Sequence, residues 1–218
     1  MKLAIIAATG GVGRQLLSQA LAAGHDVTAV ARNPARLPHD VPAGRPARIV
    51  AVDLASPYPH LLESAIAGAD AVLSALGPHN NADAGIAAPG IQAIITATRA
   101  AGVRIAKPLF GKVYQDLAQM EDILRESGLD WTILRPPQLT GKPLTGHYRT
   151  AYGRNVRGGR SIPRADVARY MLTVTGQPET IGQVVGIAAQ LGQAATGGVG
   201  RAGQTVVSSV SSPGGGEL

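Results

Sequence analysis

The sequence contains no cysteine and few aromatic residues: one Trp, one Phe and five Tyr among 218 residues. Without cysteine, a disulfide framework and a thiolate metal site are both excluded. With so few aromatic rings, the core has to be built from Ala, Val, Ile and Leu, as in α/β proteins. No signal peptide and no membrane-spanning apolar run is visible, so we expect a cytoplasmic protein.

The charge balance is basic, with a formal net charge of +6 at pH 7. Late arginines contribute much of this charge: Arg149, Arg154, Arg157, Arg160, Arg164 and Arg169. Such a segment indicates either affinity for anions or a solvated basic face. Nucleic acid is disfavoured as a partner, because no aromatic platform is interleaved with the basic residues and no recognition-helix motif is present.

The most informative motif is a glycine-rich turn that follows the first apolar run. Residues 2–7 predict a buried parallel strand, and a good helix former begins at about Gly13. The turn between them contains Thr9, Gly10, Gly11, Val12 and Gly13. A helix start has unpaired N–H groups and a positive dipole end, and glycine lets a phosphate approach closely. The context favours a dinucleotide site over a tight turn without a ligand.

Strands and helices are predicted to alternate along most of the chain. Strands are expected at residues 2–7, 26–31, 47–52, 71–76, 130–135 and 183–188, and helices at about 13–23, 57–67, 90–101, 113–127 and 161–173, the last capped by Ser161. This order predicts a doubly wound parallel sheet with helices on both faces. We expect one domain over residues 1–189 and a disordered, low-complexity tail over 190–218.

The alternation is interrupted where a fifth strand is expected. Only residues 103–106 are available before Lys107 and Pro108, and proline cannot donate to a sheet ladder. The sequence therefore predicts a shortened or missing fifth strand. The neighbouring strand at Trp131–Leu134 would lose pairing, giving either marginal stability or a homodimer that covers the gap.

Several of these segments together resemble the atypical short-chain dehydrogenase/reductase families with an NAD(P)-binding Rossmann domain, closest to NmrA-like and biliverdin reductase B/flavin reductase-like proteins. The matching segments are the Ala-Thr-Gly-x-x-Gly turn at 8–13, Ala-Arg-Asn-Pro at 31–34, Val-Asp-Leu at 52–54, Leu-Ser-Ala-Leu-Gly at 73–77, residues 128–136 and residues 162–167. The resemblance covers roughly residues 1–189 and implies an NAD(P)-dependent oxidoreductase. Ala7 departs from the family pattern, which has glycine there, and alanine is tolerable only if its φ is negative.

Arg32 indicates which dinucleotide the site prefers. It ends the second strand about 20 residues beyond the glycine turn, where an acidic residue would favour NAD and an arginine accommodates the 2′-phosphate of NADP. NADP(H) is therefore the expected cofactor, with Arg14 as a weaker second contact. A solvent-facing role for Arg32 is the alternative.

Four further residues lie at the ends of strands where the cofactor would pass. By resemblance, Asp53 and Leu54 border the adenine, although Asp53 is also suited to capping a helix. Leu76 and Gly77 end the fourth strand beside the expected crevice, and Gly77 would let the backbone pass under the cofactor. Turn chemistry alone also explains Gly77.

A catalytic proton donor is harder to identify. No tyrosine is followed by lysine four residues later, so the reductase Tyr-x-x-x-Lys pair is absent. His147 is the candidate acid, because its loop faces substrate in similar proteins, whereas a surface histidine is the plainer reading. We expect a reductase of a small planar acceptor such as a flavin or quinone. A non-catalytic NADP-sensing regulator and a truncated inactive relative are the alternatives.

Overall fold

The computed structural model describes residues 1–37, 47–54, 59–77, 87–101, 104–108 and 121–190. The predicted tail therefore lies outside the described residues, except for Gln190. Of the helix expected at 113–127, residues 121–125 are described, and they are helical.

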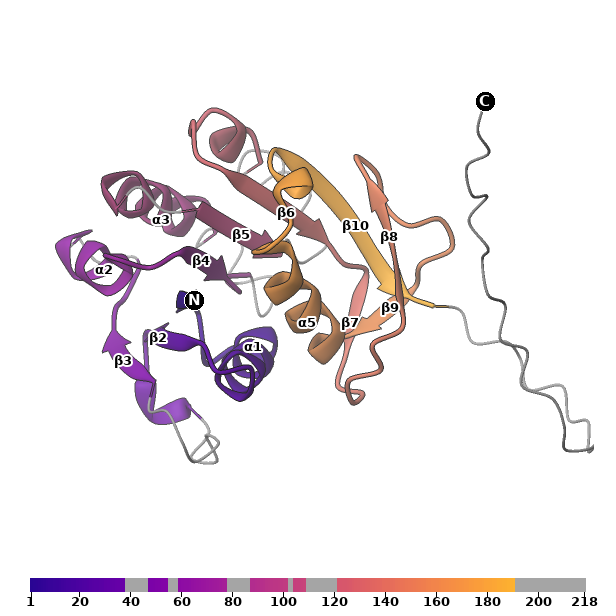
Figure 1. The fold of residues 1–218 in the computed structure, drawn as a ribbon, viewed down its shortest axis with the longest axis horizontal. Coiled ribbons are helices and arrows are strands. Elements are labelled where there is room, and N and C mark those ends of the chain that lie inside the picture. Colours follow the sequence, from indigo (N-terminus) through magenta and orange to yellow (C-terminus); the bar gives the residue numbers. More distant parts are fainter. Residues whose placement is uncertain (38–46, 55–58, 78–86, 102–103, 109–120, 191–218) are drawn as a thin grey trace, which may run out of the picture.

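A single large sheet forms the centre of the molecule (Figure 1). Its strands, in spatial order, are β3 (Arg48–Ala51), β2 (Asp26–Ala31), β1 (Lys2–Ile6), β4 (Ala71–Ser74), β5 (Arg104–Pro108), β6 (Trp131–Arg135), β10 (Gln183–Ala189) and β8 (Tyr148–Tyr152). All neighbours pair in parallel except β10 and β8. The order 3-2-1-4-5-6 is that of a Rossmann-type doubly wound sheet, which confirms the predicted fold class.

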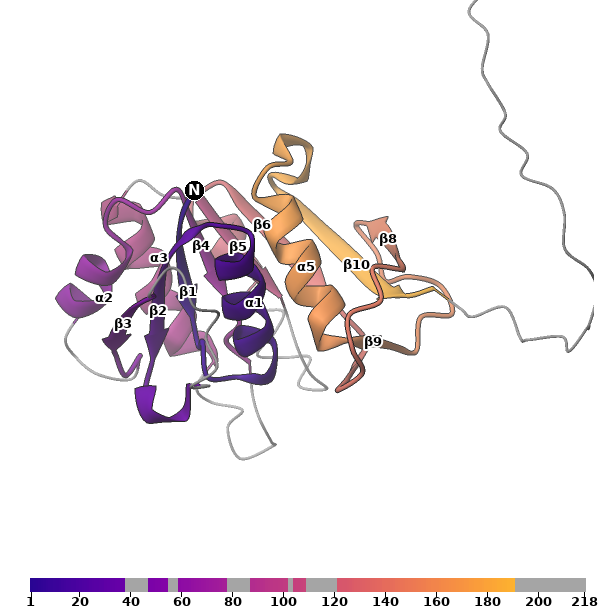
Figure 2. The ribbon, with the colours of Figure 1, turned by 60° about the horizontal axis from the view of Figure 1, so that its bottom comes forward.

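Helices cover both faces of this sheet (Figures 1 and 2). One face carries α1 (Gly11–Ala22) and α5 (Arg164–Val174), and the other carries α2 (Pro59–Ile66) and α3 (Ala87–Ala101). The short 3-10 helices η1 (Pro34–Arg36) and η3 (Pro178–Thr180) precede β3 and β10. Two buried apolar clusters, one on each face, form the core.

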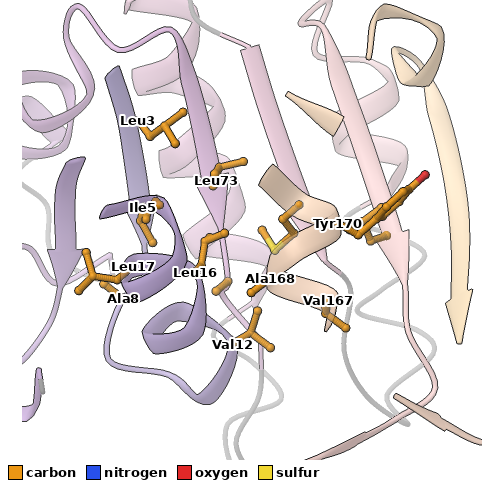
Figure 3. Packing of buried hydrophobic residues seen from close by; sticks show 14 of the residues in the cluster. Leu3, Ile5, Ala8, Val12, Leu16, Leu17, Leu73, Val167, Ala168 and Tyr170 are labelled. Carbon is orange, nitrogen blue, oxygen red and sulfur yellow. The ribbon is translucent and has the colours of Figure 1, made fainter. Parts of the chain in front are cut away.

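The cluster between α1, α5 and the sheet positions the site described below (Figure 3). Val12 and Leu16 of α1 pack in the same cluster as Val167 and Ala168 of α5, and all four side chains are buried. Both helices run antiparallel to the strands, because α1 leads from the end of β1 and α5 leads towards the start of β10. The starts of α1 and α5 therefore lie at the same edge, where the parallel strands end.

The fifth strand is present, so the prediction that it is shortened or missing is wrong. β5 has five residues, as do β1 and β6, and it pairs with β4 on one side and β6 on the other. Pro108 is its last residue, where a missing N–H interrupts little of the ladder. Ile133 and Leu134 are paired with both β5 and β10. The gap that a homodimer was expected to cover is absent from this described part of the sheet.

The region after β6 contains structure that the sequence pattern did not reveal. Ser161 does not cap a helix: it begins β9 (Ser161–Pro163), which pairs in parallel with β7 (Gln138–Thr140) as a separate two-stranded sheet. Helix α5 begins after Pro163 instead. The prediction failed because Pro163 suits a strand end as well as a first helical turn.

Candidate functional site

The glycine-rich turn joins β1 to α1 at the carboxyl edge of the sheet. Gly10 is the N-cap of α1, and its N–H donates to the carbonyl of Ala7 at 3.0 Å. This N-cap provides no side-chain hydrogen bond, and the first turn of α1 contains no acidic residue. The N–H groups of Gly11, Val12 and Gly13 have no acceptor within the helix by geometry. The turn thus leaves a positive helix end available to an anion.

Ala7 adopts a backbone conformation that contradicts the expectation of a negative φ. Its φ is 58°, the only positive value at a non-glycine residue in the described part of the chain. The left-handed region is costly for an L-residue with a Cβ. The turn nevertheless needs it, because this conformation directs the Ala7 carbonyl towards the N–H of Gly10. The positive φ that this turn requires explains why glycine suits the position, and Ala7 adopts the same φ although it has a Cβ.

Gly13 has a steric reason to be glycine. A Cβ atom there would overlap the carbonyl oxygen of Ala7 and lie 2.9 Å from the Cα of Ala8. The absence of a side chain lets α1 start directly against the end of β1, as a pyrophosphate-binding turn requires. Val12 is different: its side chain is buried in the core, so it offers only its backbone N–H to a ligand.

Two arginines belong to the segments that meet beside the α1 start, Arg14 on α1 and Arg32 after β2. Arg32 follows the last residue of β2 and is exposed. The Asn33 side chain accepts a hydrogen bond from the N–H of Ala35 and caps η1. Arg14, on α1, donates to the carbonyl of Arg36 at 2.8 Å and ties η1 to α1. These contacts place Arg14 beside η1, which follows Arg32 in the sequence, and the assignment of both arginines to the 2′-phosphate stays a prediction.

Leu54, expected to border the adenine, and Leu76, expected beside the crevice, meet against Gly90, a glycine that was not predicted to belong to the site. A Cβ on Gly90 of α3 would lie 2.8 Å from Cδ2 of Leu76 and 3.6 Å from Cδ1 of Leu54. Gly90 thus makes room for Leu54 and Leu76 where β3 and β4 end, although nothing in its sequence context signals this. Asp53 is exposed, whereas Gly77 is half-buried.

His147 lies far along the same edge, beside the end of β10. Its carbonyl accepts from the N–H of Gln190 at 3.2 Å, and its N–H donates to Oγ1 of Thr145 at 3.1 Å. The residue is exposed. It precedes β8, which is five strands away from β1, roughly 24 Å at the usual strand spacing. His147 therefore lies far from the glycine turn, and its catalytic role stays a prediction.

A buried carboxylate organises the loop before β8. Asp166, in the first turn of α5, is fully buried and accepts the N–H groups of Thr145 and Gly146 at 2.9 and 2.8 Å. It also accepts the Thr145 hydroxyl at 2.7 Å. This loop lies about twenty residues before Asp166 in the sequence, so no local pattern around Asp166 indicates the contact. The side chain is therefore used within the protein rather than offered to a ligand.

Tyr170 cannot replace the absent tyrosine–lysine pair. Burial first, and then the neighbouring Tyr152, raise the pKa of Tyr170 well above its ordinary value. Its ring packs edge to face against Tyr148 at 5.5 Å between centroids. A phenol held in its neutral form this firmly is a core residue and not a poised proton donor.

A second buried carboxylate lies at the end of β6. Glu121 is 3 % exposed and accepts Nε and Nη2 of Arg135 at 2.7 and 2.6 Å, as well as Nη2 of Arg125 at 3.0 Å. This ion-pair cluster fixes helical residues 121–125 to the sheet. No group of three or more His, Cys, Asp or Glu side chains in the described part of the chain could hold a metal ion.

The chain matches a protein-family model described as NAD(P)H-binding over residues 7–106 and 103–178. Among solved structures, a Rossmann-fold NAD(P)-binding protein from Shigella flexneri is similar, with 24% identity, a TM-score of 0.73 and coverage of 92% of this chain and 97% of that one. A short-chain dehydrogenase/reductase from Veillonella parvula, solved with NADP, has 17% identity, a TM-score of 0.73 and coverage of 86% and 94%.

A third similar structure is a protein from Streptococcus pneumoniae described as a candidate NADH-flavin reductase. It has 23% identity and a TM-score of 0.69, and the match covers 87% of this chain and all of that one. These likenesses show a shared fold. Separately, the described helices include none long and apolar enough to span a membrane.

Proposed function

Because the chain belongs to the NAD(P)H-binding family, we propose that it is an NADPH-dependent reductase of a planar acceptor such as a flavin or quinone. The observation that carries the cofactor preference is the arginine at the end of β2. Arg32 is exposed there, and Arg14 is tied to η1 beside it. A guanidinium suits bidentate contact with the 2′-phosphate that distinguishes NADP from NAD.

Two features of the glycine turn fit the cofactor. The start of α1 has no side-chain cap, and Gly13 lies so close to the backbone of Ala7 that even a Cβ would overlap it. The N–H groups of Gly11, Val12 and Gly13 would hold the pyrophosphate, with Thr9 and Gly10 shaping the turn. The side chains of Leu54 and Leu76, with Asp53 and Gly77 beside them, would line the path of the adenine and ribose. When bound, the dinucleotide supplies a hydride.

The acceptor class follows from the limited acid chemistry of the described residues. No tyrosine in the sequence is followed by lysine four residues later, and Tyr170 is buried with a raised pKa, so neither offers the usual acid that protonates the alkoxide of a reduced carbonyl. A flavin or quinone accepts hydride into a conjugated ring and can take its proton from solvent. His147, exposed at the same sheet edge, is the residue we propose as an auxiliary proton donor.

An NADP-sensing regulator is the second candidate, and the missing tyrosine–lysine pair favours it. Steady-state oxidation of NADPH against a panel of flavins and quinones separates the two functions. Turnover with any acceptor excludes a purely sensory role. Tight NADPH binding without turnover across the panel would instead favour the regulator.

The cofactor preference is tested by titrating NADPH and NADH calorimetrically into the wild type and Arg32→Ala. We expect the variant to lose about 1.5–3 kcal/mol of NADPH binding, the usual range for a charged hydrogen bond, and to bind NADH unchanged. Arg48→Ala is the matched control, because Arg48 begins β3 at the opposite edge of the sheet. Equal affinities for the two dinucleotides in the wild type would remove the argument from Arg32.

A further inference from the structure

We propose that Arg164 is a second, side-chain ligand for the cofactor pyrophosphate, reaching the glycine turn from helix α5. This inference rests on the proposed function, since it assumes that the glycine turn binds a dinucleotide. It gives one member of the late basic segment a specific role. The arginine acts on the part of the cofactor that NADPH and NADH share.

The contact between Arg164 and the glycine turn is direct. Gly11 is the first residue of α1, and a Cβ placed on it would lie 2.7 Å from both Cδ and Nε of Arg164 and 3.7 Å from Cζ. The arginine side chain therefore lies across the bare backbone of Gly11. Its guanidinium therefore begins beside Gly11, whose N–H is one of those that would hold the pyrophosphate.

The electrostatic setting of Arg164 calls for an anion. Arg164 is the first residue of α5, where the helix dipole is positive, and its side chain lies against the positive end of α1 as well. Among the described residues, none of the ion pairs includes Arg164. The nearby carboxylate of Asp166 is already bonded to Thr145 and Gly146. A half-buried cation at two positive helix ends is stabilised by a negative group that joins it.

The start of α5 is held firmly enough to aim this side chain. The carbonyl of Ala165 accepts a hydrogen bond from Nε2 of Gln19 at 2.9 Å, which joins α5 to α1. Ile162 and Ala165, on either side of the Pro163–Arg164 pair, are buried. Because the backbone on both sides is packed, little ordering is needed for Arg164 to meet a ligand.

Arg164 approaches the turn from a different side than the arginines assigned to the 2′-phosphate. Arg14 is bonded to the carbonyl of Arg36 on the β2 side of α1, whereas Arg164 comes from α5. The 2′-phosphate follows the ribose towards β2. Arg164 should consequently contribute equally to NADPH and NADH, unlike Arg32.

The test measures dissociation constants of NADPH, NADH and ADP-ribose for the wild type, Arg164→Gln and Arg164→Lys. We expect Arg164→Gln to bind all three about 10- to 100-fold more weakly, as for loss of a charged hydrogen bond, and Arg164→Lys to recover part of the loss. Arg169→Gln is the matched control, an exposed arginine on the same helix. Unchanged affinities in Arg164→Gln, or a loss confined to NADPH, would overturn the proposal.

Thermal unfolding of the ligand-free protein separates ligand binding from a merely structural role. We expect Arg164→Gln to melt at the same temperature as the wild type or higher, because it removes a cation from two positive helix ends, and to gain less stability from added NADPH. A lower melting temperature with unchanged dinucleotide affinity would make Arg164 structural. If the wild type binds none of the three ligands, the proposed function fails first, and that result is distinct from a failure of Arg164.

Discussion

The starts of α1 and α5 lie at the same edge of the sheet but are built in opposite ways. The α1 start has a glycine N-cap, no side-chain cap and no acidic residue in its first turn. The α5 start follows a strand that ends at Pro163, and its first turn contains Asp166, whose carboxylate bonds back to an earlier loop. The first N–H groups of α1 are left without a side-chain acceptor. The α5 start instead contains Asp166, whose carboxylate binds the loop at Thr145 and Gly146.

The two helix starts therefore differ in which groups they use: backbone N–H groups at α1 and side chains at α5. At α1, the proposed binding would use backbone N–H groups, so small residues and unusual φ values should matter most there. At α5, the side chains matter: Asp166 turns inward and Arg164 turns towards Gly11. The backbone-built start should therefore be sensitive to added atoms, and the side-chain-built start to removed ones.

The largest expected effect comes from adding atoms at the α1 start. Gly13→Val should abolish detectable NADPH binding, because its Cβ would overlap the carbonyl of Ala7 and push α1 away from the end of β1. Overpacking of this kind also costs about 1–3 kcal/mol of folding free energy, yet the protein should remain folded. Titration with NADPH and urea unfolding measure the two effects.

Gly141→Val is the matched control for that variant. A Cβ at Gly141 would have no heavy atom within 4 Å, and its φ is not positive. Both affinity and stability should stay near the wild-type values. Normal NADPH binding by Gly13→Val would mean that the glycine turn serves the fold alone.

Removing the carboxylate at the α5 start is the next largest perturbation. Asp166→Ala deletes three hydrogen bonds to Thr145 and Gly146 and should cost about 2–4 kcal/mol in urea unfolding. Amide exchange should rise in the loop before β8, including at His147. Asp122→Ala, which removes an exposed carboxylate paired with Arg125, should cost about 0–1 kcal/mol. Equal costs for the two variants would contradict the fastening role of Asp166.

The same division explains what could be predicted from the sequence. The turn around Gly10 and Gly13 and the helix after it could be predicted because they depend on residues adjacent in the sequence. The doubly wound sheet could be predicted from the alternation of strands and helices. The α5 start depends on contacts between distant segments, such as Asp166 with Thr145 and Arg164 with Gly11. No periodicity encodes such contacts. For the same reason the prediction of a shortened fifth strand from Pro108 is wrong. The pairing of β5 with β4 and β6 is not visible in the residues adjacent to Pro108 in the sequence.

The smallest expected effect, and the one with the opposite sign, concerns the strained residue of the α1 turn. Ala7 has a φ of 58°, which costs an L-residue about 1–2 kcal/mol, whereas glycine adopts it freely. Glycine loses about 0.5–1 kcal/mol more backbone entropy than alanine on folding, so Ala7→Gly should stabilise the protein by a net ~0.5–1 kcal/mol. Urea unfolding measures this gain.

Ala8→Gly, one residue further along, provides the contrast for Ala7. Ala8 is fully buried and does not have a positive φ, so the same substitution there removes a packed methyl group and adds only entropy cost. It should destabilise the protein by about 1 kcal/mol or more. If Ala7→Gly raises and Ala8→Gly lowers the free energy of unfolding, the positive φ of Ala7 costs the protein stability. Destabilisation by both substitutions would mean that the positive φ at Ala7 carries no strain.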